Sequence, residues 1–446
     1  NTIIGFILIA GVLFGFSYYS RPSQEEIQQM QRQDSLELVA KQQAEAEMKA
    51  KEAAAIAQKA EAAQDSTSLF FKNRQGKDQN IVLQNNLVKI TLGTRGGMVK
   101  EALLKDYKNQ QGGPVCLLNE KDASMNFVLE GKNENLNSRD FFFTPVAATD
   151  SSVTMRLENQ DGGVLDLEYK LHSDSYMLDL KIASSGLGKY FSPSMKTINL
   201  SWYDKAMQQE KGFDFENQYS TLTYKIKDEG TDYLNASEDK TEDVKERLDW
   251  IAFKNQFFSC VFIAHQDFTD ATLSSTPQPK NSGYLKEYNA EMKTFFDPSG
   301  SKTTDLQLYF GPNNYHILST TNDLSLSDKD LEMQDLVYLG WPLFKWINRF
   351  FIIYLFDWLN GLGLSMGIVL LLLTIIIKVL VYPTTRKSYI ASAKMRVLKP
   401  KIDALNEKYP DPNDALKKQQ EMMQLYSQYG ANPMGGCLPM LIQMPF

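Results

Sequence analysis

The chain has 446 residues, of which 43% are hydrophobic and 23% are charged, an ordinary balance for a folded protein that has room for more than one domain. Acidic and basic residues are mixed along the sequence, so the formal net charge of −7 indicates little about partners. No basic tract is present, and the sequence therefore gives no sign of direct binding to nucleic acid.

The first element is an uncharged apolar run over residues 2–19. A helix needs about 20 apolar residues to cross the bilayer core, so the run is long enough once its flanks are added. A cleaved signal peptide is the alternative, but the run is longer than a typical signal-peptide core and no small-x-small cleavage site follows it. We predict an uncleaved transmembrane helix over residues 1–20.

Residues 21–65 form a charged segment rich in Ala, Glu, Gln and Lys. This composition favours a helix, yet the apolar residues keep no sustained heptad, which argues against a coiled coil. We predict a solvated spacer that is helical or partly disordered.

Residues 66–330 change to a pattern of period two, which is typical of β-strands. Val88, Ile90 and Leu92 alternate with polar residues, and two further alternating runs, 153–157 and 165–171, flank a glycine-containing turn. Two such runs joined by a glycine turn indicate a hairpin. The whole segment predicts a large antiparallel β-sandwich.

This segment shows no sign of catalytic, metal or cofactor chemistry. Cys116 and Cys260 would share an oxidising compartment and could pair, but their spacing forms no disulfide framework, and we expect unpaired buried thiols. None of His172, His265 and His316 is spaced with another histidine or a cysteine as a metal pair, and no nucleophile motif is present. A membrane-anchored protein that binds or processes carbohydrate through the sandwich, or a purely structural envelope protein, are the alternatives that remain.

Residues 331–361 are aromatic and amphipathic. Tryptophan and tyrosine prefer the headgroup level of a bilayer, and Lys345 and Arg349, four residues apart, share one helical face. Asp357 and Asn360 argue against a separate span. We predict an amphipathic interfacial helix on the outer surface of the membrane.

Residues 362–383 form a second apolar run with one charged residue, Lys378, and we predict a second transmembrane helix here. Basic residues gather just after it, which marks the cytoplasmic side. Residues 21–361 then lie on the opposite, outer side. The basic residues are Arg386, Lys387, Lys394, Arg396, Lys399 and Lys401.

Residues 384–431 predict a cytoplasmic helical hairpin. Apolar residues recur every three or four positions up to Tyr409, Pro410 and Pro412 break the first helix, and the second helix ends before Gly430. Residues 432–446 begin a third apolar segment that does not finish, so we expect the front part of a longer polytopic α-helical membrane protein.

Several motifs now resemble one known family, the YidC-type membrane protein insertases. They are residues 382–385, residues 393–402 and above all the run 432–445, NPMGGCLPMLIQMP; in the outer segment, residues 94–97 with 102–107 are similar to the start of the family's large periplasmic domain. The resemblance covers the whole chain.

The resemblance implies a non-enzymatic insertase and chaperone in the bacterial inner membrane, acting alone or with the Sec translocon and without a cofactor. It also implies a core of five spans around a polar groove and a periplasmic β supersandwich. The implied partners are nascent membrane proteins, the Sec translocon, the ribosome or signal-recognition machinery, and the lipid bilayer.

Lys378 is the candidate substrate-groove residue. From spacing alone, snorkelling is preferred, because Tyr382 lies only about 6 Å further along the helix towards the headgroups. The family, however, places a cation, usually arginine, at this position of the groove, so the resemblance favours the groove. Lysine keeps the charge but not the planar fork of arginine.

Periodicity alone predicts that the hairpin is an inert connector. With the resemblance, its exposed basic and methionine residues become a candidate cytoplasmic docking site. These are Lys394, Arg396, Lys399, Lys401, Met422 and Met423.

Overall fold

The computed structural model describes residues 68–234, 237–326, 329–340, 342–410 and 414–429. The chain divides into two compact units, Asn1–Gln334 and Asp335–Phe446. The expected first span, the spacer at 21–65 and the start of a third span at 432–446 lie outside the described residues.

The described part of the first unit is a β domain in which every strand pair is antiparallel. A four-stranded sheet has the order β1 (Asn80–Gln84), β2 (Val88–Gly93), β3 (Val99–Lys108) and β4 (Pro114–Leu118). The main path of a 14-stranded sheet is β6 (Asn135–Asn137), β5 (Ala123–Glu130), β11 (Thr197–Met207), β17 (Tyr284–Phe295), β16 (Phe258–Pro277), β18 (Thr304–Pro312), β10 (Met177–Ser185), β9 (Val164–Leu171), β8 (Ser152–Glu158) and β7 (Thr144–Ala148).

Four more strands pair beside this path, and short helices and 3-10 turns fill the connections. The strands are β12 (Thr221–Ile226), β13 (Thr231–Tyr233), β14 (Lys240–Val244) and β15 (Leu248–Lys254). The helices are α3 (Phe213–Gln218) and α4 (Tyr315–Ser319), with turns η1 (Phe71–Asn73), η2 (Ser138–Asp140), η3 (Gly188–Tyr190) and η4 (Thr320–Leu324).

The expected alternation is confirmed in particular strands. Val88, Ile90 and Leu92 are all fully buried along β2. The predicted hairpin is β8 and β9, which pair from Ser152↔Lys170 to Glu158↔Val164. Gly162 takes a positive φ of 78° in the turn between them, a conformation that glycine adopts without strain.

Strand β16 has a bulge near its middle and pairs with two sets of neighbours. Its first half pairs with β15 and β18, and its second half pairs with β14 and β17. Between the halves, Asp267 and Asp270 have positive φ values of 65° and 48°, and the register shifts between Thr269 and Thr272. Aspartate tolerates this region better than most residues, so the bulge bends the strand at low cost.

Aromatic packing lies at the centre of the β domain. Trp202, fully buried, stacks on Phe253 with ring centroids 3.7 Å apart and meets Phe262 edge-on at 5.9 Å. Its Nε1–H has no hydrogen-bond partner among the residues that the structure describes. The ring therefore stabilises the core by contact alone, at the cost of one unpaired polar group.

Replacing Trp202 tests this balance. We expect Trp202→Ala to lower the free energy of unfolding by about 3–5 kcal/mol, because it leaves a cavity. Trp202→Phe should cost clearly less, since a ring remains and the unpaired N–H is removed. Denaturant unfolding of the chain in detergent, followed by circular dichroism, measures both variants, and equal losses would contradict the explanation.

The β domain ends in a strap, residues 329–334, that is held by buried charges. Lys329 Nζ pairs with Asp249 at 2.9 Å and also with Asp267, and both carboxylates are almost fully buried. The Trp250 indole N–H donates to the Leu331 carbonyl at 2.7 Å, and the Leu331 side chain is fully buried. The strap is thus part of the β domain.

Because of these ion pairs, the contribution of the strap to the stability of the fold depends on pH. Burial alone would raise the pKa of Asp267, but hydrogen bonds from Lys329 and Lys227 outweigh it and hold that pKa below its usual value. A carboxylate with a lowered folded-state pKa stabilises the fold above its unfolded pKa of about 3.9, and this stabilisation is lost as the pH falls through the folded pKa.

We expect Lys329→Met to lower the free energy of unfolding by about 2 kcal/mol at neutral pH, because two buried carboxylates each lose one of their cationic partners, while Lys227 still bonds Asp267. The difference from the wild type should narrow once the pH falls below about 3.9. Lys280→Met is the matched control, since Lys280 and its partner Asp214 are both well exposed. Denaturant midpoints at several pH values provide the measurement, and a deficit that does not depend on pH would argue against the charge mechanism.

The described part of the second unit is helical. Its elements are η5 (Met333–Leu336, which begins in the strap), α5 (Pro342–Ile347), the π-helical turn η6 (Asn348–Ile352), α6 (Ile353–Asn360), α7 (Met366–Lys408) and α8 (Ala415–Gln428).

Helix α7 differs from the sequence expectation at both ends of the predicted span 362–383. The helix starts at Met366, after a turn in which Gly363 has a positive φ of 71°. It continues through Pro383 and Pro400 to Lys408, where a separate element after residue 383 was expected. A proline removes one backbone hydrogen bond of the helix, and here the hydrogen bonds on either side keep the helix continuous.

Candidate functional site

One helical segment among the described residues is long and apolar enough to cross a membrane. It is Met366–Pro383, an almost wholly apolar segment with only 6% of its residues buried. An apolar helix that packs against so little protein needs another apolar environment, and a bilayer core supplies one. Lys378 is its one charged residue.

The polar residues of this segment lie along one face. Apart from glycine and proline, the segment contains only three residues that are not plainly apolar, Thr374, Lys378 and Tyr382, and they are spaced four apart. Residues at i and i+4 are neighbours on a helix, and Thr385 continues the same line. We call these four residues the polar stripe.

The stripe places hydrogen-bonding groups beside the charge. Lys378 and Tyr382 are exposed, so the ammonium and the phenol are open to the surroundings of the helix. The Thr374 hydroxyl donates to the Leu370 carbonyl at 2.8 Å, which satisfies it within the helix. Apolar residues make up the other faces of the helix, and several of them, such as Ile375 and Val379, are exposed.

The sequence analysis singled out Lys378 and missed its companions. Threonine and tyrosine do not interrupt a hydropathy average, so Thr374 and Tyr382 pass as part of the apolar run. The signal that finds them is their spacing, which projects to a single line only once the segment is known to be helical.

The candidate docking residues lie on the end of α7 and on α8. Lys394, Arg396 and Lys399 are exposed along α7. Lys401 is engaged, because its ammonium hydrogen-bonds the Tyr429 hydroxyl and lies 4.4 Å from the centre of that ring. On α8, Met422 is half-buried, whereas Met423 is 63% exposed.

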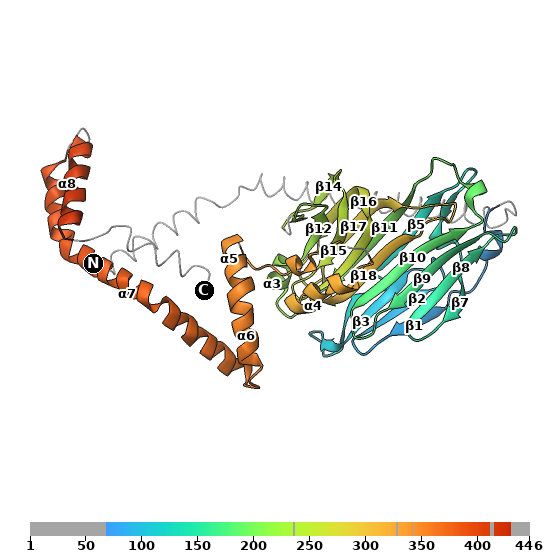
Figure 1. The fold of residues 1–446 in the computed structure, drawn as a ribbon, viewed down its shortest axis with the longest axis horizontal. Helices are drawn as coiled ribbons and strands as arrows, with labels where there is room; N and C mark the ends of the chain where they lie inside the picture. The colour runs from blue at the N-terminus through green and yellow to red at the C-terminus, as the bar shows by residue number, and fades with distance from the viewer. Residues whose placement is uncertain (1–67, 235–236, 327–328, 341, 411–413, 430–446) are drawn as a thin grey trace, which may run out of the picture. The chain divides into compact units, whose positions relative to one another are not determined.

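Glu421 joins the two helices. Both of its oxygens accept from Lys408 Nζ at 2.9 Å, and the Tyr409 hydroxyl donates to it at 2.7 Å. The hydrogen bond from Lys408 lowers the pKa of Glu421, so the pair is charged at neutral pH. Together with the contact between Lys401 and Tyr429, these bonds hold α8 against the last turns of α7 (Figure 1).

The β domain shows little that would support catalysis. His172 pairs with Asp179 at 2.9 Å and His265 hydrogen-bonds Gln307 at 2.8 Å. Cys116 and Cys260 are free thiols, as expected, and burial raises the pKa of Cys116 to about 12, so this thiol is not an activated nucleophile. No cluster of three potential metal ligands occurs in the described ranges.

Two family models match the chain: a YidC periplasmic domain over residues 80–354 and a 60Kd inner membrane protein over residues 358–446. Among curated relatives, the membrane protein insertase YidC of Phocaeicola vulgatus is 57% identical over 446 residues, which is all of this chain and 72% of the relative. The insertases of Bacteroides fragilis and Porphyromonas gingivalis, matched over the whole chain and over 72% and 73% of their own lengths, are 53% and 36% identical.

Similar solved structures include an active YidC insertase with its first transmembrane domain resolved, at 18% identity and a TM-score of 0.31 over 83% of this chain and 70% of that one. A galactose mutarotase related enzyme from Lactobacillus acidophilus has 9% identity and a TM-score of 0.34 over 52% of this chain and 97% of that one.

The full-length identity to curated insertases and the two family models agree with each other, and they leave no support for the carbohydrate-binding alternative. The chain belongs to the YidC family: it is a membrane protein insertase of the bacterial inner membrane, with a periplasmic β domain and no enzymatic activity.

Proposed function

We propose that the polar stripe of α7 lines an intramembrane groove and that Lys378 attracts the acidic outer tail or a polar loop of a nascent client partway into the bilayer. The observation that carries this proposal is the position of Thr374, Lys378 and Tyr382 on one face of the apolar segment. Water in the groove would shorten the apolar path that the polar segment crosses, and no bond is made or broken.

The energetic argument concerns where the polar residues lie. A charged side chain at the bilayer centre costs about 2.5–3.5 kcal/mol on insertion scales. Snorkelling would lower the cost of Lys378, which is about 7.5 Å by helical rise from Pro383. It gives no reason for Thr374 to lie one turn deeper on the same line. A groove lining accounts for all the residues of the stripe.

Lysine in place of the family's usual arginine restricts the ways in which this residue can contact a client. Lysine offers a compact point charge with three donors, whereas arginine offers a planar fork that binds a carboxylate through two bonds. Lys378 still supplies the positive charge that a mechanism of long-range attraction needs. We therefore propose charge attraction, without bidentate recognition.

We propose that residues 1–20 span the membrane, that residues 21–361 are periplasmic with an interfacial helix at 331–361, and that residues 362–383 span again. Support for the interfacial helix comes from a line of aromatic side chains four residues apart, each more than half exposed. These are Trp346, Phe350, Tyr354 and Trp358.

On the cytoplasmic side, we propose a helical hairpin over residues 384–431, followed by the start of a third span at 432–446. The bonds of Glu421 to Lys408 and Tyr409 support the hairpin. The exposed residues Lys394, Arg396, Lys399 and Met423, with Lys401 and Met422 at the helix contact, are proposed to dock the ribosome or signal-recognition machinery, and the Sec translocon is a proposed partner within the membrane.

Replacing Lys378 tests the groove cation. We expect Lys378→Arg to keep activity and Lys378→Ala to reduce insertion of acidic-tailed clients at least roughly five-fold, which corresponds to about 1 kcal/mol of lost attraction. Insertion is measured in cells depleted of the wild-type protein. Lys417→Ala, at an exposed lysine of α8 outside the span and outside the proposed docking residues, is the matched control, and full activity of Lys378→Ala would disprove the mechanism.

The stripe itself makes a second prediction. In a chain without its natural cysteines, single cysteines at positions 374, 378 and 382 should react with a water-soluble maleimide much faster than cysteines at 375 and 379. The reason is that water in a groove reaches one face of the helix only. Equal reactivity around the helix would show that Lys378 lies in no groove, even if its charge matters.

A further inference from the structure

The helical unit presents a row of exposed aromatic rings. Helix α5, the π-helical turn η6 and helix α6 follow one another without a break over residues 342–360 (Figure 1). Residues 347–349, 352–353 and 355–356 are half-buried, so the exposed rings mark one face of this stretch. We call these rings the aromatic line, and they are 63%, 56%, 63% and 62% exposed in chain order: Trp346, Phe350, Tyr354 and Trp358.

A spacing of four residues does not by itself keep four side chains on one face. In an α-helix each residue turns by about 100°, so three steps of four residues would carry Trp358 about 120° around the axis from Trp346. The π turn Asn348–Ile352 lies between these two residues. A π turn takes up one residue more than an α-helical turn, so the path from Trp346 to Trp358 equals about 11 α-helical steps, within about 20° of three full turns. The π turn therefore aligns the rings.

Contacts within the unit fix the start of this stretch. The side-chain amide of Asn348, the first residue of the π turn, donates to the Leu339 carbonyl at 3.0 Å. Lys345 pairs with Asp335 at 2.7 Å, so the ammonium beside the line is bonded within the unit. The rings of Trp346 and Phe350 lie 5.7 Å apart between centroids, as expected for neighbours on one face.

The position of the stretch in the chain indicates what covers the aromatic line. Helix α6 ends at Asn360, and the apolar segment of α7 begins at Met366. The two helices are in contact, and Leu359 of α6 and Val369 of α7 are almost fully buried. The end of a membrane span lies at the bilayer surface, where tryptophan and tyrosine are most favourable. Lipid is therefore the apolar partner within reach of the line.

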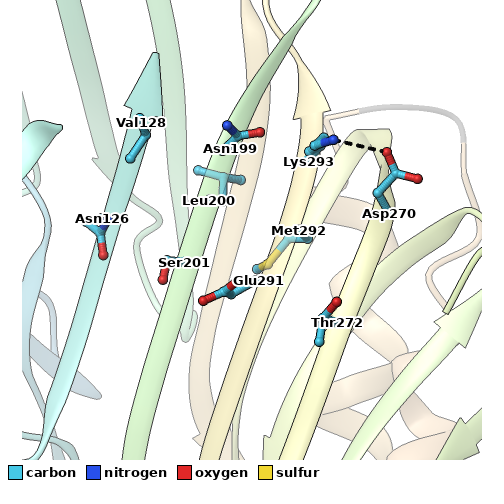
Figure 2. Close-up of a pocket in the computed structure, with 10 residues that line it drawn as sticks. All are labelled: Asn126, Val128, Asn199, Leu200, Ser201, Asp270, Thr272, Glu291, Met292 and Lys293. Atoms are coloured by element: carbon cyan, nitrogen blue, oxygen red, sulfur yellow. Dashed lines mark hydrogen bonds and ion pairs between the residues drawn. The ribbon is translucent and has the colours of Figure 1, made fainter. Parts of the chain in front are cut away.

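The face of the large sheet shown in Figure 2 has a different character. Its shallow hollow is lined mostly by polar residues, and none of the described residues that line it is aromatic. Lys293 and Asp270 pair there at 3.3 Å. Such a face is suited to water, whereas the aromatic line is suited to the boundary between water and lipid.

We infer that the π turn η6 sets the register that makes Trp346, Phe350, Tyr354 and Trp358 one continuous contact with the outer leaflet, so that α5 and α6 lie at the same depth. The inference rests on the proposed interfacial position of this helix and goes beyond it, because it names the lipid-facing residues and the turn that aligns them. Without the π turn, the line would divide into two parts that face different directions.

The test measures the depth of each position in the full chain. Single cysteines are placed in a chain without its natural cysteines, labelled with a nitroxide and placed in lipid nanodiscs. Power-saturation EPR then compares contact with oxygen, which concentrates in lipid, and with a water-soluble nickel chelate. The oxygen-to-nickel ratio should agree within about twofold along the line and exceed that of the control at least about fivefold. The line variants are Trp346→Cys, Phe350→Cys, Tyr354→Cys and Trp358→Cys; the control is Asn360→Cys, exposed and about 200° around the helix from Trp358.

Two variants that change the length of the helix by one residue test the role of the π turn. One alanine inserted between Ile352 and Ile353 should turn α5 by about 100° relative to α6, so the labels at 346 and 350 should leave the lipid while those at 354 and 358 stay. Deletion of Phe351 removes the extra residue of the turn and should keep all four labels at one depth. Both variants disturb the helix to a similar extent, so each controls for the other.

Three results would overturn the inference. Four labels that stay in lipid after the insertion would exclude the register role of the π turn. Labels at 354 and 358 in lipid, with those at 346 and 350 in water, would exclude a continuous line and leave the interfacial position of α6 intact. Four labels in water, or hidden from both reagents, would exclude lipid as the partner. The insertion assay with Lys378→Ala tests the groove mechanism separately.

Discussion

A single positive charge within an apolar helix is the constraint on which the membrane part of this protein depends. Without Lys378, the segment Met366–Pro383 would be an ordinary span, stable wherever lipid surrounds it. With Lys378, the segment needs water, an anionic group or a polar neighbour on one side. Thr374 and Tyr382 lie on that side, and the apolar residues on the other faces can still contact lipid.

The β domain is subject to a different constraint: the chain must leave a large sheet and continue into the helical unit. The bend of β16 at Asp267 and Asp270 lets one strand pair with two sets of neighbours. The same Asp267 then holds Lys329 of the strap. One residue thus supplies both the backbone geometry of the bend and a charge that holds the last segment of the chain against the domain.

Local patterns in the sequence predict much of this structure, and long-range geometry explains what they miss. Alternation located β2 and the hairpin of β8 and β9, because each strand buries one face. Strand β16 could not be located in this way, since its 20 residues bury different faces before and after a bulge. The continuation of α7 through Pro383 was also missed, because a proline marks a possible end of a helix without requiring one.

The same distinction applies to the candidate site on α7. Lys378 could be found from the sequence, because a single charge stands out in an apolar run. Thr374 and Tyr382 could not, since neither residue interrupts the apolar pattern and both join the line of Lys378 only when the segment is known to be helical.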